Sequence, residues 1–194
     1  MIADVNELEL NTGNVYDVNI QNVVATGSLN QNIDLLAIMK VFRTAEYRPE
    51  KFPGLCFRLK QPRTATLIFT TGKMVCTGAK SEKIAEIAIK KVVRELNEKG
   101  IISKVKPEIT IQNMVASANL GEGVDLETAA DIMDNIMYEP EQFPGAVYRM
   151  SDPKVVILIF SNGKIVITGA KKEKHVFEAA EKMRAILAEY DLLY

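Results

Sequence analysis

The chain contains several short stretches in which apolar and polar residues follow a strand pattern. β-branched residues dominate 18–26 (VNIQNVVAT), a composition that favours a strand. Alternation predicts further strands over three ranges, 55–60, 64–70 and 73–79. The last two are joined by Thr-Gly at 71–72, and Asn-Gly occupies the matching place at 162–163. These dipeptides are typical of tight hairpins, so we expect antiparallel neighbours.

Helical spacing appears in two places. A short helix is expected over about 33–43, entered near Asp34, because an acidic residue suits a helix start. A long helix is expected over about 81–98. Its apolar positions recur at helical intervals: Ile84, Ile87, Ala88, Val92 and Leu96. The prolines of YRPEKFPG between the short helix and the next strand exclude regular helix there.

The whole pattern occurs twice. Shifting the sequence by 91 residues aligns 18–103 with 109–194 without gaps, and 32 of the 86 pairs are identical. The matching long helix has Val176, Ala179, Ala180, Met183 and Leu187 on its apolar side. We therefore expect an α+β protein made of two related repeats, 18–105 and 106–194, with pseudo-twofold symmetry. Residues 1–17 precede the repeats and are expected to form a flexible arm.

The predicted sheet has apolar residues on both faces. In 73–77, Lys73, Val75 and Thr77 share one face, and Met74 and Cys76 share the other. The helices of each repeat can cover only one face. The second face is then an exposed apolar binding surface, or the two repeats bury it against each other as a sandwich core. The lysines on this face count against the sandwich.

Composition narrows the function classes. The chain has 194 residues, 47% hydrophobic and 25% charged, with a net charge of −1, which by itself argues mildly against nucleic acid. Cys56 and Cys76 match no metal or redox spacing, and no apolar run approaches the ~20 residues of a membrane span. MIADVNELELNTGN is no secretory signal. We expect an intracellular protein and no membrane partner.

No catalytic or cofactor motif is found. The sequence offers no carboxylate pair, nucleophile elbow or metal-ligand cluster in either repeat. TGAK lacks the glycine spacing of a phosphate loop, and His175, the single histidine, has no partner cysteine or second histidine. We expect neither enzymatic activity nor a cofactor nor a metal.

The motifs resemble those of the TATA-box-binding protein family of archaea and eukaryotes over essentially all of 18–194. The matching segments are IQNVVAT and IQNMVAS, AEYRPEKFPG and MYEPEQFPG, and PRTATLIFTTGKMVCTGAKSE and PKVVILIFSNGKIVITGAK. The resemblance implies a saddle: a ten-stranded curved antiparallel sheet with four helices on its convex face. Phe-Pro-Gly at the first stirrup loop, as well as the second, leans towards the archaeal members.

The resemblance also implies a role for each residue of the second sheet face. The concave face would bind the minor groove of a TATA box, and two pairs of phenylalanines, one pair at each end, would enter the base stack and kink the DNA: Phe52, Phe69, Phe143 and Phe160. Further residues would contact bases and sugars: Asn22, Asn113, Thr77, Thr168, Val24, Val75, Val115, Val166, Leu67, Leu158, Pro53 and Pro144. Four cations would hold phosphates: Arg58, Arg149, Lys73 and Lys164.

Protein partners follow from the same resemblance. Tyr138, Glu139, Pro140 and Glu141 match the stirrup that transcription factor B grips, and recruitment of RNA polymerase would follow. The first repeat has Arg48 in place of Glu139, a charge difference that could orient asymmetric partners.

Two other functions stay open. One is a protein-interaction member without DNA binding, which loss of the wedge phenylalanines would signal. The other is self-association through the concave face when DNA is absent.

Overall fold

The computed structural model describes residues 15–194. Of the expected arm, residues 1–14 lie outside the described part, and Tyr16 and Asp17 already belong to the first strand. The first repeat forms β1 (Tyr16–Ser28), α1 (Leu35–Val41), β2 (Leu55–Leu59), β3 (Thr64–Ile68), β4 (Lys73–Ala79) and α2 (Glu82–Glu98). The second forms β5 (Glu108–Asn119), α3 (Leu126–Ile132), β6 (Ile136–Met137), β7 (Ala146–Met150), β8 (Val155–Ile159), β9 (Lys164–Ala170) and α4 (Glu173–Glu189).

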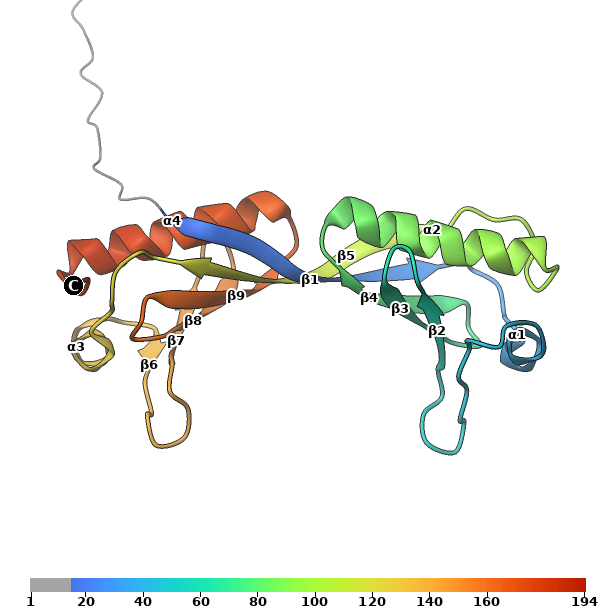
Figure 1. Cartoon of the computed structure of the whole chain (residues 1–194), viewed down its shortest axis with the longest axis horizontal. Coiled ribbons are helices and arrows are strands. Elements are labelled where there is room, and N and C mark those ends of the chain that lie inside the picture. The colour runs from blue at the N-terminus through green and yellow to red at the C-terminus, as the bar shows by residue number, and fades with distance from the viewer. Residues whose placement is uncertain (1–14) are drawn as a thin grey trace, which may run out of the picture.

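The strands form one continuous antiparallel sheet in the order β2-β3-β4-β1-β5-β9-β8-β7-β6. The sheet arches into a saddle, with α2 and α4 end to end on its convex face and α1 and α3 at its two ends (Figure 1). The loops that carry Phe-Pro-Gly descend from the concave side. We call residues 47–54 the first stirrup and 138–145 the second. The saddle and its α+β class are as predicted.

The described part of the sheet has nine strands, not the ten expected. The counterpart of β6 in the first repeat is reduced to a single bridge between Glu46 and Cys56. Ile136 and Met137 pair with β7 over two residues, whereas their counterparts Ala45 and Glu46 make only that one bridge. Small and charged residues are weaker strand formers than Ile and Met, and this accounts for the shorter pairing.

The two repeats join edge to edge, so the sandwich alternative is wrong. β1 and β5 pair along their length, from Tyr16 opposite Asn119 to Ser28 opposite Glu108. Near the middle of this seam Asn22 lies opposite Val115. Within residues 15–194, one sheet face therefore stays uncovered.

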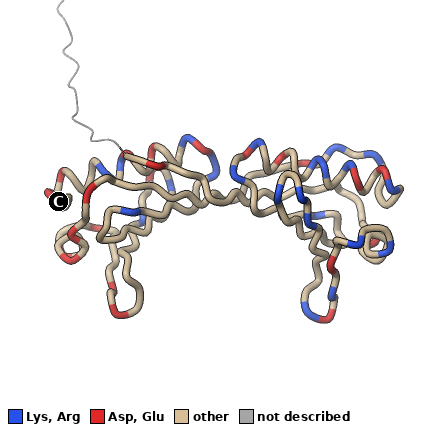
Figure 2. Tube along the Cα trace, viewed as in Figure 1, with Lys and Arg blue, Asp and Glu red and all other residues tan. Residues whose placement is uncertain are grey.

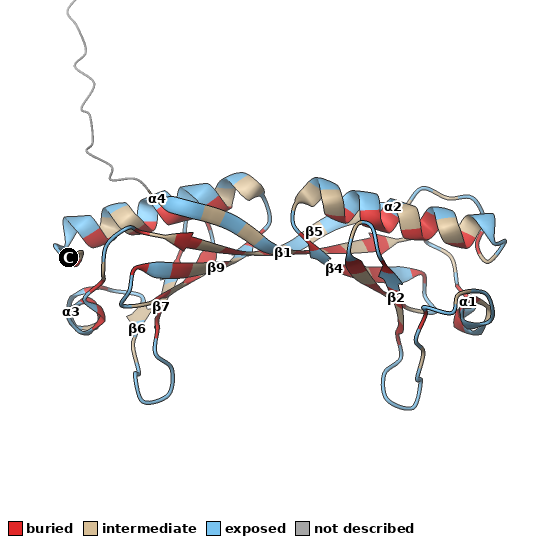
Figure 3. Ribbon diagram, viewed as in Figure 1, coloured by how far each residue is buried: buried red, intermediate tan, exposed pale blue. Residues whose placement is uncertain are grey.

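The core lies between the sheet and the helices. Along β4, Met74 and Cys76 are fully buried while Val75 and Thr77 stay partly exposed, the alternation the sequence predicted (Figure 3). Burial raises the pKa of the Cys76 thiol, so this cysteine is a packed, unreactive group. One helix position was misplaced: Ile87 is 46% exposed, and the buried face of α2 consists of Ala85, Ala88, Ile89, Val92, Val93 and Leu96.

The long helices meet at the pseudo-dyad and cap each other. Glu82 Oε1 accepts a hydrogen bond from the backbone N–H of Glu173 (3.0 Å), and Glu173 Oε1 accepts one from the N–H of Glu82 (3.1 Å). Each carboxylate satisfies a free N–H at the positive end of the opposite helix. This reciprocal cap ties the convex sides of the two repeats together.

The short helices start at aspartates, as predicted for Asp34. At α3, Asp125 accepts hydrogen bonds from the backbone N–H (3.0 Å) and hydroxyl (2.7 Å) of Thr128. These bonds favour the ionised carboxylate, and the pKa of Asp125 lies below its ordinary value of 3.8.

The cap predicts an acid-sensitive contribution to stability. The pKa of Asp125 is lower in the folded than in the unfolded state. The stabilisation from its ionised carboxylate is therefore fully present above about pH 4 and is lost as pH falls through the folded-state pKa. Asp125→Asn should therefore narrow the difference in unfolding midpoint between pH 7 and pH 3, measured by thermal melts followed by circular dichroism. Equal pH dependence in both proteins would contradict this role. Thr128→Ser, which retains the hydroxyl, is the matched control.

No helix in the described part of the chain is long and apolar enough to cross a membrane.

Candidate nucleic-acid interface

The concave face is an apolar surface that includes alternate residues of six strands, β1, β3, β4, β5, β8 and β9. Cross-strand register brings Leu67 beside Val75 in the first repeat and Leu158 beside Val166 in the second. Val24 and Val115 occupy the centre, on either side of the seam. All six side chains are partly exposed, while their neighbours along each strand are buried beneath the helices. The predicted apolar residues therefore share one surface.

Each end of this surface carries a pair of phenylalanines. The ring centroids of Phe52 and Phe69 lie 5.9 Å apart, and those of Phe143 and Phe160 lie 5.8 Å apart, both edge to face. Phe52 is 45% exposed although it is a large apolar residue. Each pair joins a stirrup residue to a residue that follows a strand of the sheet. The structure thus brings together the two phenylalanines of each pair that is predicted to enter the base stack; we call such a pair a wedge.

The glycine of Phe-Pro-Gly makes this pairing sterically feasible. A Cβ at Gly54 would lie 2.7 Å from the ring of Phe52 and 3.0 Å from that of Phe69. A Cβ at Gly145 would lie 2.8 Å from the ring of Phe143. Real Cβ atoms do not approach so closely, so a larger residue at either position would push the rings out of these places. Pro53 and Pro144 stay exposed beside them.

Two asparagines near the seam are held in one orientation. The backbone N–H of Gly78 donates to Asn22 Oδ1 (2.7 Å), and Asn22 Nδ2 donates to Thr77 Oγ1 (3.0 Å). The second repeat repeats this arrangement: Gly169 N–H donates to Asn113 Oδ1 (2.7 Å), and Asn113 Nδ2 donates to Thr168 Oγ1 (3.3 Å). Because one Nδ2 hydrogen points to the threonine, each amide keeps its other Nδ2 hydrogen to offer to a ligand.

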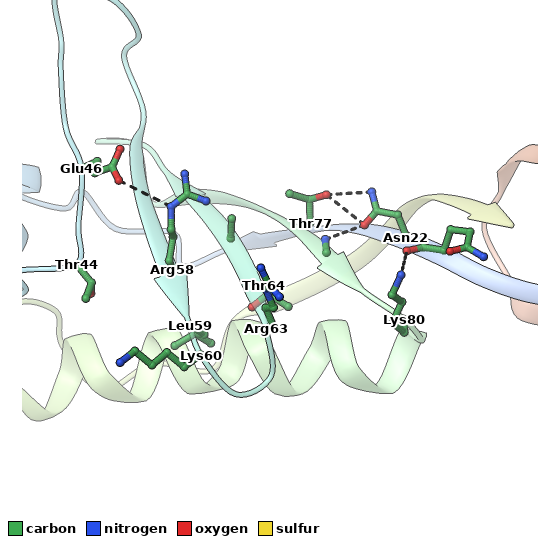
Figure 4. A pocket seen from close by; sticks show the side chains of 13 residues that line it. Asn22, Thr44, Glu46, Arg58, Leu59, Lys60, Arg63, Thr64, Thr77 and Lys80 are labelled. Carbon is green, nitrogen blue, oxygen red and sulfur yellow. Dashed lines mark hydrogen bonds and ion pairs between the residues drawn. The ribbon is translucent and has the colours of Figure 1, made fainter.

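Cations border the face. Arg58, Arg149, Lys73 and Lys164 are all exposed, as the phosphate role requires. Arg58 lines a hollow of about 830 Å³ that opens beside Asn22 and Thr77 (Figure 4). Arg58 Nε lies 3.9 Å from Glu46 Oε1, an exposed pair that leaves the guanidinium accessible.

The sequence analysis missed several cations around the same hollow. Lys60, Arg63 and Lys80 line it together with Arg58. In the second repeat a hollow of about 590 Å³ is lined by Arg149, Lys154, Lys171 and the partly buried His175. The 91-residue register would have found Lys80 and Lys171, which are matching lysines of TGAK.

The residues predicted to contact transcription factor B lie on the second stirrup. Glu139, Pro140 and Glu141 are exposed, and Tyr138 is partly buried. They are remote from the seam and from the central apolar surface, so a protein bound there would leave most of the concave face free (Figure 1). Within residues 15–194 no cluster of three or more metal-binding side chains occurs.

A curved sheet with an open apolar face, paired phenylalanines at both ends, fixed amide donors at the centre and a cationic border defines a DNA-binding protein of the minor-groove class. Comparison with known proteins gives the family. The family described as transcription factor TFIID (or TATA-binding protein, TBP) matches residues 17–99 and 108–190. The chain belongs to this family of TATA-box-binding proteins.

The similar proteins include archaeal relatives named TATA-box-binding protein. One from Pyrodictium occultum is 56% identical over 165 residues, 85% of this chain and 83% of that protein. Another, from Methanocaldococcus jannaschii, is 50% identical over 173 residues, 89% and 94% of the two chains. A solved structure described as Methanococcus jannaschii TBP matches with a TM-score of 0.81 and 50% identity, covering 89% of this chain and 99% of that one.

Proposed function

We propose that this protein is a general transcription initiation factor that lies with its concave face on the minor groove of the TATA box and kinks the DNA with its phenylalanine pairs. Membership of the family supports the initiation role and the TATA-box target. The observation that carries the binding mode is the doubled edge-to-face phenylalanine pair on an uncovered apolar sheet. The proposal concerns DNA recognition, and the family is one of DNA-binding factors rather than enzymes.

Selectivity for A·T pairs follows from the centre of the face. The minor groove of A·T pairs presents only acceptors, whereas G·C pairs add a protruding amino donor. Asn22 and Asn113 can each donate a hydrogen bond from Nδ2, and the side chains of the valines around them have no hydrogen-bonding group. A G·C amino group would meet these donors or the apolar surface without an acceptor. Base steps such as TA also unstack more easily, which adds selectivity at the kinks.

The phenylalanines supply the bend. Apolar side chains inserted between base steps unstack them and bend the duplex towards the major groove, and TATA-box-binding proteins are themselves a familiar example of this behaviour. Phe52 and Phe143 stand on the stirrups, and Phe69 and Phe160 support them from the sheet. The kink is taken from the family, and the paired rings support it here.

The net charge of −1 is compatible with DNA binding because charges are unevenly placed. Cations border the concave side and the second stirrup carries acidic residues, whereas the long helices carry charges of both signs (Figure 2). Burial of the apolar face would supply much of the affinity, so the salt dependence is expected to be shallow.

The first test is a duplex that contains TATAAA and carries a dye at each end, compared with a scrambled duplex of equal composition. Selective binding, with energy transfer rising as the ends approach, is the expected result. Equal affinity for both duplexes without any change in energy transfer would overturn the proposal. It would favour the alternative of a family member that acts through protein interaction or self-association alone.

We extend the proposal to partners. Transcription factor B would bind the second stirrup, and RNA polymerase would join the resulting complex in the cell, where the genome lies. The exposed Glu139 and Glu141 support this assignment, because the first stirrup has Arg48 in place of Glu139. We also propose that the two repeats extend over 18–105 and 106–194, as expected from the sequence.

Reversing the charge of the second stirrup should separate the two activities. Glu139→Lys with Glu141→Lys is expected to weaken factor B recruitment at least tenfold, because charge complementarity across the contact would be lost. A tenfold change corresponds to about 1.4 kcal/mol of binding free energy. TATA binding should change little. A gel-shift assay with the DNA complex and added factor B measures both.

The first stirrup provides the matched control for this experiment. Glu50→Lys changes the counterpart of Glu141 and should leave recruitment intact. Unchanged recruitment by the second-stirrup variant would contradict the assignment.

A further inference from the structure

The two ends of the saddle differ in charge and in exposed apolar surface. We propose that they bind each other, so that the α1 end of one copy docks on the α3 end of a second copy of this chain. Such a contact lies outside the concave face and is separate from the DNA interface. It is also distinct from self-association through that face.

The α1 end carries an apolar and basic stripe. Leu36, Met39 and Lys40 are exposed on α1, whose buried residues are Leu35 and Ile38, and the exposed Arg43 follows directly after the helix. Leu36 is 61% exposed and Met39 37%. Large apolar side chains grouped on one outward face beside cations mark an interaction surface rather than a solvated helix. We call these four residues the basic stripe.

The α3 end carries acidic residues at the same positions. Glu127, Ala130, Asp131 and Asp134 are the counterparts of the basic stripe in the 91-residue register, and we call them the acidic stripe. Its three carboxylates are exposed. The neighbouring Ile132 (49% exposed) and Met137 (52%) supply apolar surface at this end. Each end therefore combines exposed apolar groups with a stripe whose charged residues have one sign.

The charge contrast extends beyond the stripes. Residues 34–51 contain four basic and three acidic side chains, whereas the matching residues 125–142 contain six acidic and no basic ones. Figure 2 shows this contrast at the end helices and along the two stirrups. No ion pair found in residues 15–194 involves a charged residue of either stripe. The charges are thus available to a second molecule.

Charge selects the partner end. Like ends repel, so contacts between two α1 ends or two α3 ends are disfavoured, and opposite ends attract. The ends point away from each other along the molecule, and a single copy cannot bring them together (Figure 1). A head-to-tail contact of this kind does not close on itself in general, and it produces short linear chains. It would also cover surface beside the second stirrup, a consequence for factor B that rests on the proposed function.

Sedimentation velocity of the DNA-free protein over a concentration series tests the contact. Association is expected at low ionic strength and should weaken at least tenfold when salt rises from about 0.05 to 0.5 M, because salt screens exposed charges. Two variants then localise it. The first, Lys40→Asp with Arg43→Asp, has two acidic ends. The second, Asp131→Lys with Asp134→Arg, replaces two of the three carboxylates of the acidic stripe by cations.

The expected result is complementation. Each variant alone should associate about tenfold or more weakly than the parent chain, and an equimolar mixture should regain association because opposite ends are restored. TATA binding and circular dichroism verify the fold of both variants. A carbodiimide, which joins amines to nearby carboxylates, should link Lys40 to Asp131 or Asp134, and such a link must be intermolecular.

Three results would overturn the proposal: a parent chain that stays monomeric at low salt, variants that associate as the parent does, or a mixture that regains nothing. The second result would assign self-association to the concave face instead.

Discussion

Replacing both Phe143 and Phe160 by alanine is expected to weaken TATA binding by about 100-fold and to remove one of the two kinks. The rings lie 5.8 Å apart and form one wedge, so removing both leaves the base step at that end stacked. End-to-end energy transfer in the doubly labelled duplex should fall to a value between free and fully bent DNA. Titration of the same duplex gives the affinity.

The repeat supplies the matched variant for the wedge. Phe52→Ala with Phe69→Ala should remove the kink at the opposite end and leave the Phe143 end unaltered, which a dye placed at one end and one in the middle can distinguish. Phe177 lies on α4, on the convex side of the sheet, and its side chain is 46% exposed. Phe177→Ala should therefore alter neither the affinity for DNA nor the bend. A full bend in the double variant would refute the wedge.

The second large effect is expected at the seam, from Asn113→Asp. The variant keeps an oxygen that accepts from the N–H of Gly169, so the backbone contact survives. It exchanges the donor Nδ2 for a charged oxygen that faces the acceptors of the minor groove. Loss of a donor combined with this repulsion should reduce affinity about 100-fold, measured by fluorescence anisotropy with a TATA duplex.

Two further variants show whether the effect is local. Asn22→Asp should weaken binding to a similar degree, because Asn22 has the same contacts in the first repeat. Asn97→Asp adds the same charge on α2 at the convex side and should change affinity little. If all three variants weaken binding equally, net charge rather than the amide donor is responsible.

Much of the fold could be predicted because its signals are local or periodic. Alternation along β4 assigned Met74 to the core and Val75 to the open face, and the 91-residue shift predicted two equivalent repeats. The choice between an open face and a sandwich needed the pairing of β1 with β5, which lies between distant segments and has no local signature. Pairing at Glu46 is reduced to a single bridge, and strand propensity alone does not predict how many residues pair there.

The site was predicted less completely for the same reason. Resemblance to the family assigned Phe52 and Phe69, and the structure brings them into contact. The steric reason for Gly54, and the cluster of Lys60 and Arg63 with Arg58, depend on approaches between elements that spacing does not reveal. The reciprocal cap of Glu82 and Glu173 likewise joins residues 91 positions apart.

The seam between β1 and β5 also has a consequence for assembly at low protein concentration. Cut apart, each repeat would expose a long unpaired edge strand and would have to find its partner by diffusion. The short connection between α2 and β5 turns that encounter into an intramolecular one, with an effective concentration of about a millimolar for such tethers. The saddle therefore stays whole at copy numbers far too low for two separate halves to remain associated. Because the two repeats are covalently linked, dilution cannot separate them as it would separate the two subunits of a dimer.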